Sequence, residues 1–523
     1  MYQIMLSDLV PKDNFYRQLD TAIDLSFLYR ETKKYYGIEG HASIDPLVFF
    51  KIILVGYLNN INSDRKLMEY CSDSLAVRLF VQYDIDEELP WHSTISRTRQ
   101  LYGEEVFLTL FKKVLSLCVE KGMVRGKRQA MDSALIKANA SMDSLLEKEV
   151  LEDAEQYAFE LQDNNSQEIT SQGITPEDKS NKTVTTQKQK EVQQHHHWKK
   201  EAYKAMPSNV NTKQTDEHGN LIRPKFLSNH THYSPTDPDA RIAVKPGKAR
   251  VMNYYAQLAV DQSHHVITAA GADYADKRDS ECLKHLLNQT IGNLKENNIE
   301  LEEITADTGY SSGEALQYCK EKNIDAYIPN FGQYKNEREG FIYNKEKDRY
   351  ECERGNRALL PFKKIVTDSK GYTKRVYRSD NSRCKACPLR KKCIGKSDFK
   401  KIEDSIHKPL YDAMHEKLKT AYAKRIMRKR SSTVEPVLGT LINFLNMKRI
   451  NTRGIKQANK HILMSALSYN LKKYLKFNNK RRVGACMQLK NQQILTTQKV
   501  FSTIFLLSRC INHCFVQKKL LSV

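Results

Sequence analysis

The 523-residue chain has no long hydrophobic run, and its acidic residues are far fewer than its basic ones. Because no stretch of about 18 apolar residues occurs, the sequence predicts no transmembrane helix. Its first residues contain no basic segment followed by an apolar one, so we expect no secretory signal. Hydrophobic residues make up 40% and charged residues 28%, proportions typical of a soluble globular protein with about two to four domains.

The excess of basic residues indicates a polyanionic partner. Lys and Arg number 84 against 62 Asp and Glu, which gives a formal net charge of +22. A protein this basic attracts polyanions, and without a membrane signal nucleic acid is the first candidate. The alternative is a soluble enzyme that is merely basic.

The 11 cysteines are an odd number in a chain without a secretion signal. They indicate reduced thiols rather than a disulfide framework. Four of them form a cluster, with Cys384, Cys387 and Cys393 close together and Cys352 further upstream. This spacing fits a tetrahedral Zn²⁺ site, and the alternative is a set of reduced thiols in a basic loop.

The N-terminal residues predict helices. Pro46 stands at a plausible first helical position, and Ser63 or Asp64 can cap the next helix. Ser93 is expected to cap a short basic helix that carries Arg97 and Arg99. Two helices joined by a turn, with these arginines on the second, favour a helix-turn-helix-like DNA contact. The alternative is an ordinary helical bundle with a basic surface.

The pattern changes after residue 125 to that of an α/β protein. Strands are expected at residues 128–138, 254–261, 266–271, 303–307 and 325–329, with helices at 276–297 and 313–322. The sequence therefore predicts a mixed sheet flanked by helices. We expect seven segments in chain order: a helical DNA-binding domain (1–125), the first core strand (126–144), a polar, partly disordered insertion (145–230), the α/β core (231–329), a β-rich, cysteine-containing insertion (330–405), C-terminal helices (406–475) and a basic tail (476–523).

Three acidic residues stand out by position. Asp132 lies within an apolar strand, Asp307 ends another strand before a glycine turn, and Glu435 follows a run of basic residues. Burying such acids is costly unless they are paired or bind a metal, although any one of them alone could be a solvated residue. Two Mg²⁺ ions held by bridging carboxylates are the arrangement of many DNA-cleaving enzymes. The basic run would hold the DNA backbone through Lys424, Arg425, Arg428, Lys429 and Arg430.

The segments around these acids, residues 131–141, 306–310 and 434–437, resemble the three catalytic blocks of bacterial insertion-sequence DDE transposases. The resemblance implies an RNase H-like catalytic core in which Asp132, Asp307 and Glu435 bind Mg²⁺ or Mn²⁺. It also implies cleavage of double-stranded DNA at transposon ends, strand transfer by the freed 3′-hydroxyl, and a homodimer in the synaptic complex. A bacterial, cytoplasmic, nucleoid-associated protein is expected.

The third block departs from the pattern of many relatives, Tyr-x2-Arg-x3-Glu-x6-Lys, because only its glutamate is present. The corresponding positions here are Arg428, Ser431, Glu435 and Ile442. Two alternatives therefore stay open: a catalytically inactive, DNA-binding derivative of a transposase, and an RNase H-like nuclease with another role.

Overall fold

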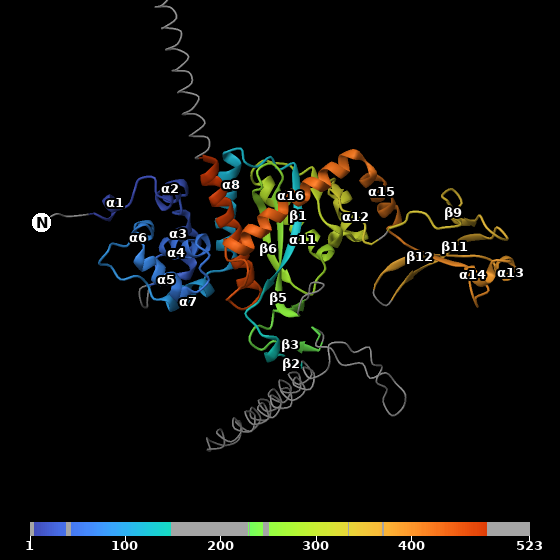
Figure 1. Ribbon diagram of the computed structural model, residues 1–523, viewed down its shortest axis with the longest axis horizontal. Helices are drawn as coiled ribbons and strands as arrows, with labels where there is room; N and C mark the ends of the chain where they lie inside the picture. The colour runs from blue at the N-terminus through green and yellow to red at the C-terminus, as the bar shows by residue number, and fades with distance from the viewer. Residues whose placement is uncertain are drawn as a thin grey trace, which may run out of the picture.

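The computed structural model of the chain describes residues 5–37, 43–147, 228–229, 231–243, 250–332, 334–368 and 371–478. Most of the expected polar insertion and nearly all of the expected basic tail lie outside these residues. Figure 1 shows three parts in a row: N-terminal helices, a central sheet flanked by helices, and a second sheet at the far end. In the part of the chain that is described, no helix is long and apolar enough to cross a membrane.

The N-terminal part is helical, as expected. Pro46 occupies the first turn of its helix, where its missing N–H costs nothing, and Ser63 caps the next helix through the Lys66 amide. The expected cap at Ser93 is wrong, because that residue lies inside a helix that begins one residue earlier. The helices are α1 (Leu6–Leu9), α2 (Phe15–Ala22), α3 (Phe27–Thr32), α4 (Pro46–Leu58), α5 (Asp64–Asp73), α6 (Leu75–Val81), α7 (His92–Leu101) and α8 (Glu104–Glu120), with the 3-10 turn η1 (Lys33–Tyr35).

The central sheet is mixed. Its strands run β6-β5-β1-β7-β8, and the short β4 also pairs with one end of β5. The pairs β6/β5 and β5/β1 are antiparallel, whereas β1/β7 and β7/β8 are parallel. The bounds are β1 (Arg128–Lys137), β4 (Arg241–Ala243), β5 (Val251–Asp261), β6 (Ile267–Tyr274), β7 (Glu303–Thr305) and β8 (Asp325–Tyr327).

Helices cover both faces of this sheet. Apolar residues of α11 (Asp279–Lys295) and α12 (Gly313–Glu321) pack against one face, beside Met131. On the other face lie α16 (Ala421–Phe444) and a helix of residues 455–478. A 3-10 turn, η3 (Thr308–Tyr310), follows β7. Beside the sheet lie η2 (Met142–Ser144) and a small ladder of β2 (Leu146–Glu147) with β3 (His232–Tyr233).

The second sheet forms a module of its own between β8 and α16. Five strands pair in the order β13-β12-β11-β10-β9, and all neighbours are antiparallel. Helix α15 (Lys408–Lys419) leads from this module into α16. The elements are β9 (Phe341–Asn344), β10 (Arg349–Cys352), β11 (Leu359–Thr367), β12 (Thr373–Arg378), β13 (Lys401–Ser405) and two short helices, α13 (Asn381–Lys385) and α14 (Arg390–Cys393).

The N-terminal helices and the central sheet share one hydrophobic core. A single cluster of buried residues extends from Tyr16 in α2 through β1 and β5 to Leu475. Polar contacts cross the same boundary: the Tyr57 hydroxyl pairs with Nδ1 of His461 at 2.8 Å, and Nζ of Lys472 donates to the Leu58 carbonyl at 2.7 Å. Figure 1 shows the helix of residues 455–478, in orange-red, beside α8 and between the two parts. The N-terminal helices are therefore completed by residues more than three hundred positions away.

We predict that a fragment of residues 1–125 does not fold cooperatively, because its core side chains lose the helix of residues 455–478. Circular dichroism during a urea titration should show a broad, gradual change for the fragment. A chain ending at residue 478 should show a sigmoidal transition. A sigmoidal transition of the fragment alone would contradict the shared core.

Candidate active site

Two of the three predicted acids are brought together by strand register. β1 and β7 are parallel, with Ala130 opposite Thr305. Asp132 follows Ala130 by two residues and Asp307 follows Thr305 by two residues, so Asp132, in the middle of β1, lies beside Asp307, just past the end of β7. Each carboxylate also hydrogen-bonds its own chain: Oδ1 of Asp132 accepts from the Ser133 amide at 2.8 Å, and Oδ1 of Asp307 accepts from the Gly309 amide at 3.0 Å.

Arg430, a residue of α16, forms an ion pair with one of these two aspartates. Nη1 of Arg430 lies 3.1 Å from Oδ2 of Asp132, and the two side chains are only 12% and 15% exposed. The Nε atom of Arg430 is buried and has no partner among the described residues. Arg430 was predicted to hold DNA. In this structure its positive charge offsets the negative charges of Asp132 and Asp307.

A third aspartate, which the sequence reasoning missed, adjoins this pair. Asp279 begins α11; its Oδ2 accepts from the Tyr255 hydroxyl at 2.8 Å and its Oδ1 from the Gln257 amide at 3.4 Å. A Cβ atom placed on Gly309 would lie 2.6 Å from Oδ2 of Asp279 and 3.1 Å from Oδ1 of Asp307. Only glycine therefore fits between the two carboxylates. Nothing in the spacing of Asp279 marks it; the only signal is an acid at a helix start, which usually serves the helix itself.

The electrostatics of the cluster disfavour ionised carboxylates. Burial raises the pKa of Asp132, and the charge of Asp307 raises it further, against the opposing effects of the Ser133 amide and Arg430. Burial also raises the pKa of Asp307, to which the negative charge of Asp279 adds, while Arg430 opposes both. Three carboxylates share one guanidinium, so an added cation would be attracted here.

Glu435, the third predicted acid, does not join this cluster in the structure. It is exposed on α16 and has no hydrogen-bond or ion-pair partner among the described residues. Val434, Val437 and Leu441 are the α16 residues that face the sheet, and one residue step turns Glu435 about 100° away from Val434. No group of three or more Cys, His, Asp or Glu in the described part of the chain is close enough to hold a metal ion.

The two arginines of α7 have different surroundings. Arg97 is exposed, whereas Arg99 forms a bidentate ion pair with Asp64 at 2.7 and 2.9 Å and is only 17% exposed. Arg99 is therefore paired within the protein, and its contact with DNA stays a prediction. Also, α6 lies between the two helices assigned to the helix-turn-helix-like element.

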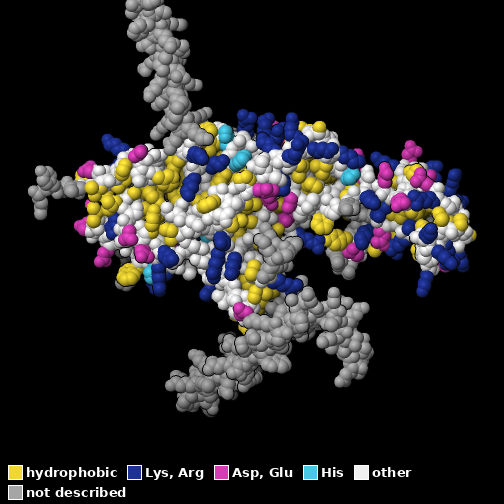
Figure 2. All heavy atoms as spheres, in the orientation of Figure 1, with side chains coloured by type: hydrophobic (Ala, Val, Ile, Leu, Met, Phe, Trp, Pro, Cys, Tyr) yellow, Lys and Arg dark blue, Asp and Glu magenta, His cyan; other side chains and the backbone are white. Residues whose placement is uncertain are grey.

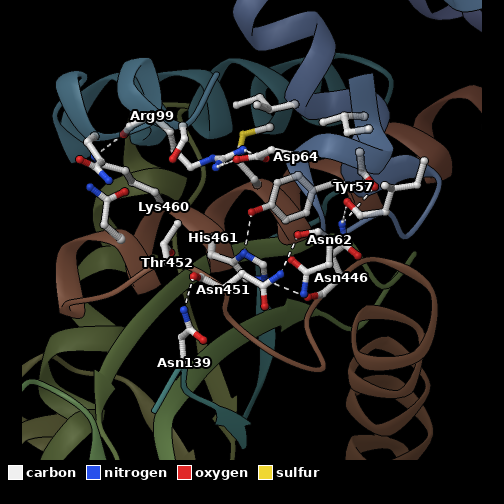
Figure 3. Close-up of a pocket in the computed structure, with 18 of the residues that line it drawn as sticks. Tyr57, Asn62, Asp64, Arg99, Asn139, Asn446, Asn451, Thr452, Lys460 and His461 are labelled. Carbon is white, nitrogen blue, oxygen red and sulfur yellow. Dashed lines mark hydrogen bonds and ion pairs between the residues drawn. The ribbon is translucent and has the colours of Figure 1, made fainter. Parts of the chain in front are cut away.

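Figure 3 shows Arg99 in the wall of a cavity of about 560 Å³ between the N-terminal helices and residues 446–464. Lys460 lies in the same wall, with Nζ donating to the Arg99 carbonyl at 3.0 Å. Carboxamides bridge the two sides: the Asn446 amide donates to the carbonyls of Gly56 and Ile61 at 3.0 and 2.8 Å. The cavity is thus a polar seam between the N-terminal helices and residues 446–464.

The remaining predicted basic residues form an exposed stripe on α16. Lys424, Arg425, Arg428 and Lys429 all lie on the solvent side of the helix, while Ala423 and Ile426 are buried. Figure 2 shows Lys and Arg side chains gathered along the upper edge of the molecule, over α16. The stripe begins beside the buried Arg430 and leads away from the aspartates along the helix.

The four clustered cysteines all lie in the second sheet's module. Cys352 ends β10, Cys384 lies in α13, Cys393 ends α14, and Cys387 lies between the two helices. None of these four cysteines forms a disulfide bond.

Two comparisons with known families match different parts of the chain. Residues 4–101 match the family described as Transposase domain (DUF772), and residues 351–475 match the family described as Transposase DDE domain. The second match contains Glu435, the basic stripe and the four cysteines, whereas Asp132 and Asp307 lie between the matched segments. No curated protein matches the chain. These two domain matches support an insertion-sequence DDE transposase.

Proposed function

We propose that this transposase cleaves DNA at the inverted repeats of its insertion sequence and joins the 3′ ends to target DNA by two-metal phosphoryl transfer. The observation that carries the proposal is the register-matched pair of Asp132 and Asp307 on neighbouring parallel strands. The order β6-β5-β1-β7-β8, antiparallel then parallel, supports an RNase H-like catalytic core.

The carboxylate oxygens of the aspartate cluster, Asp132, Asp307 and Asp279, are suitable ligands for a divalent cation. Carboxylate oxygens are the ligands that Mg²⁺ and Mn²⁺ prefer, and a cation would offset the burial and the repulsion between carboxylates that raise the pKa of both aspartates. Asp132, Asp307 and Glu435 would hold the metal ions. When bound, the ions would generate the nucleophile and neutralise the charge that develops on the phosphate.

Glu435 would have to approach the aspartates from its exposed position. Pro436, the next residue, lies inside α16, and a proline removes one backbone hydrogen bond of a helix. The helix is therefore weakened beside the glutamate, so local bending there would turn the side chain at modest cost.

The chain's own cations would hold the DNA. Lys424, Arg425, Arg428 and Lys429 would contact backbone phosphates on both sides of the cleaved bond, since they lie on the helix that carries Arg430. Exposed Arg97 of α7 would contribute a further DNA contact. Because an insertion sequence has two ends, we propose a homodimer in the synaptic complex. We place the protein at the nucleoid in the bacterial cytoplasm.

The test is cleavage of a cognate inverted-repeat end by the full-length chain. We expect strand cleavage and joining with Mg²⁺ or Mn²⁺, and DNA binding without cleavage when EDTA is present. Cleavage in EDTA would contradict metal-dependent transfer. Binding without cleavage under every metal condition would favour the inactive derivative. Cleavage without joining, and without preference for the cognate end, would favour a nuclease.

A further inference from the structure

We propose that Cys352, Cys384, Cys387 and Cys393 bind one structural Zn²⁺ ion, separate from the catalytic carboxylates. The four cysteines line a single small cavity of about 20 Å³, a size suited to one ion rather than to an organic ligand. They come from four places along 42 positions of the chain, and the fold of the module gathers them. Four thiolates around one ion are the usual ligand set of a closed structural zinc site.

The backbone approaches this cavity closely. Gly355, at φ +55°, lies where a Cβ atom would be 2.4 Å from Sγ of Cys387, so a larger residue would be strained and would displace this thiol. This glycine follows the strand that ends in Cys352. The turn that carries Gly355 therefore brings the segment after Cys352 into contact with Cys387.

The charges that line the cavity suit a metal bound by four thiolates. Such a centre carries a net charge of about −2, because four thiolates outweigh one Zn²⁺. Four cationic residues line the same cavity and no acidic residue does so: Arg354, Arg383, Arg390 and Lys400. Soft thiolates in this number select Zn²⁺ over the hard cations that the aspartates would take.

The hydrophobic core of the module contains no residue of α13 or α14. This core has four buried residues, Tyr350, Leu360, Tyr377 and Ile402, and none of them comes from residues 380–398. The two helices have five and four residues, and neither has a side-chain cap. Helices this short are not stable by themselves, so a metal that joins them to β10 would supply the missing restraint.

The thiols have local partners that zinc would replace. Sγ of Cys352 donates to the Arg354 carbonyl at 2.9 Å, and Sγ of Cys384 pairs with Oγ of Ser379 at 2.9 Å. As they stand, the four sulfur atoms do not form a group close enough to hold an ion. Thiols bind zinc as thiolates, so binding would release protons and would weaken at low pH.

The experiment is metal analysis of the purified full-length chain, followed by cobalt substitution. We expect about one zinc per chain, and a Co²⁺-substituted protein with the visible absorption of tetrahedral thiolate coordination. Cys387→Ser should lower the zinc content to less than about one tenth of that of the wild type. The control Cys319→Ala changes a buried cysteine of α12, outside the module, and should leave the zinc content unchanged.

Several outcomes would overturn the proposal. These are a wild-type protein that contains no zinc and gives no thiolate spectrum with Co²⁺, a disulfide among the four cysteines, and iron in place of zinc. If Cys387→Ser fails to fold, the cobalt spectrum of the wild type still decides the question. This readout does not depend on DNA cleavage, so failure of the zinc site and failure of the proposed activity are distinguishable.

Discussion

Asp307→Asn should lower the rate of DNA-end cleavage by about 1,000-fold or more while leaving the protein folded. A metal ligand contributes several kcal/mol of transition-state stabilisation, and each 1.4 kcal/mol corresponds to about tenfold in rate. The amide oxygen of Asn can still accept from the Gly309 amide, so the turn after β7 survives. Asp132→Asn should lose cleavage similarly, although it also removes the charge that pairs with Arg430.

The stability of Asp307→Asn in metal-free buffer distinguishes a metal ligand from a structural residue. The fold raises the pKa of Asp307, so ionisation of this carboxyl destabilises the folded state as pH rises through its folded pKa. Below the unfolded pKa both states are protonated and the penalty vanishes. The variant should therefore melt at or above the wild-type temperature at neutral pH, and the difference should shrink as pH falls toward 4.

Cleavage assays and thermal melts from pH 4 to 8 check both expectations. Asp276→Asn is the matched control, because Asp276 is an exposed aspartate paired with Arg241 at 3.5 Å outside the cluster. It should cleave at the wild-type rate. Cleavage by Asp307→Asn at more than about one tenth of the wild-type rate would remove Asp307 from the metal site.

Glu435→Gln should also lower cleavage by about 1,000-fold or more, without changing the melting temperature. The side chain is exposed and makes no described contact, so its loss should cost no folding stability. Glu435 is the one acid of α16, and only a role with metal or DNA bound would make it essential. Asp279→Asn should lower cleavage less, by about 10- to 100-fold, because Asp279 would act only by orienting the groups around Asp307.

The relative cleavage rates of Asp279→Asn and Glu435→Gln identify the third metal ligand. If Asp279→Asn abolishes cleavage and Glu435→Gln retains it, the third ligand is Asp279. Ser431→Ala is the control for α16, since Ser431 lies one turn before Glu435 on the same side of the helix. It should have little effect. Equal loss in Ser431→Ala and Glu435→Gln would mean that the helix surface, and not the carboxylate, matters.

Local patterns predicted the elements that frame the site. An apolar run with one acid predicted β1, and alternation predicted the β5–β6 hairpin. A cap at Ser311 or Ser312 predicted the start of α12, and Ser312 is the residue that caps it. These signals are local because a strand's alternation and a helix's cap depend on neighbouring residues. The meeting of Asp132 and Asp307 also follows from strand positions once β1 and β7 are known to be parallel neighbours.

The orientation of individual side chains could not be predicted in this way. Arg99 is amphipathic and could have pointed outward, but Asp64 of another helix offers it a bidentate partner. Asp279 became a neighbour of Asp307 only because α11 begins beside the Gly309 turn. Glu435 faces solvent because Val434 takes the buried position beside it. Each outcome depends on tertiary packing, which a single sequence does not display.

If the proposed function holds, the contact between Arg430 and Asp132 would link metal binding and DNA binding thermodynamically. While the guanidinium is paired with the aspartate, less of its charge is available for a phosphate. A cation that displaced it would free a positive charge beside the stripe of Lys424, Arg425, Arg428 and Lys429, and bound DNA would in turn draw Arg430 away from the aspartate. Each ligand would then raise the affinity for the other by the same factor, because linkage is reciprocal. A transposase with such an exchangeable internal counter-ion would bind its cations weakly until a DNA end is present.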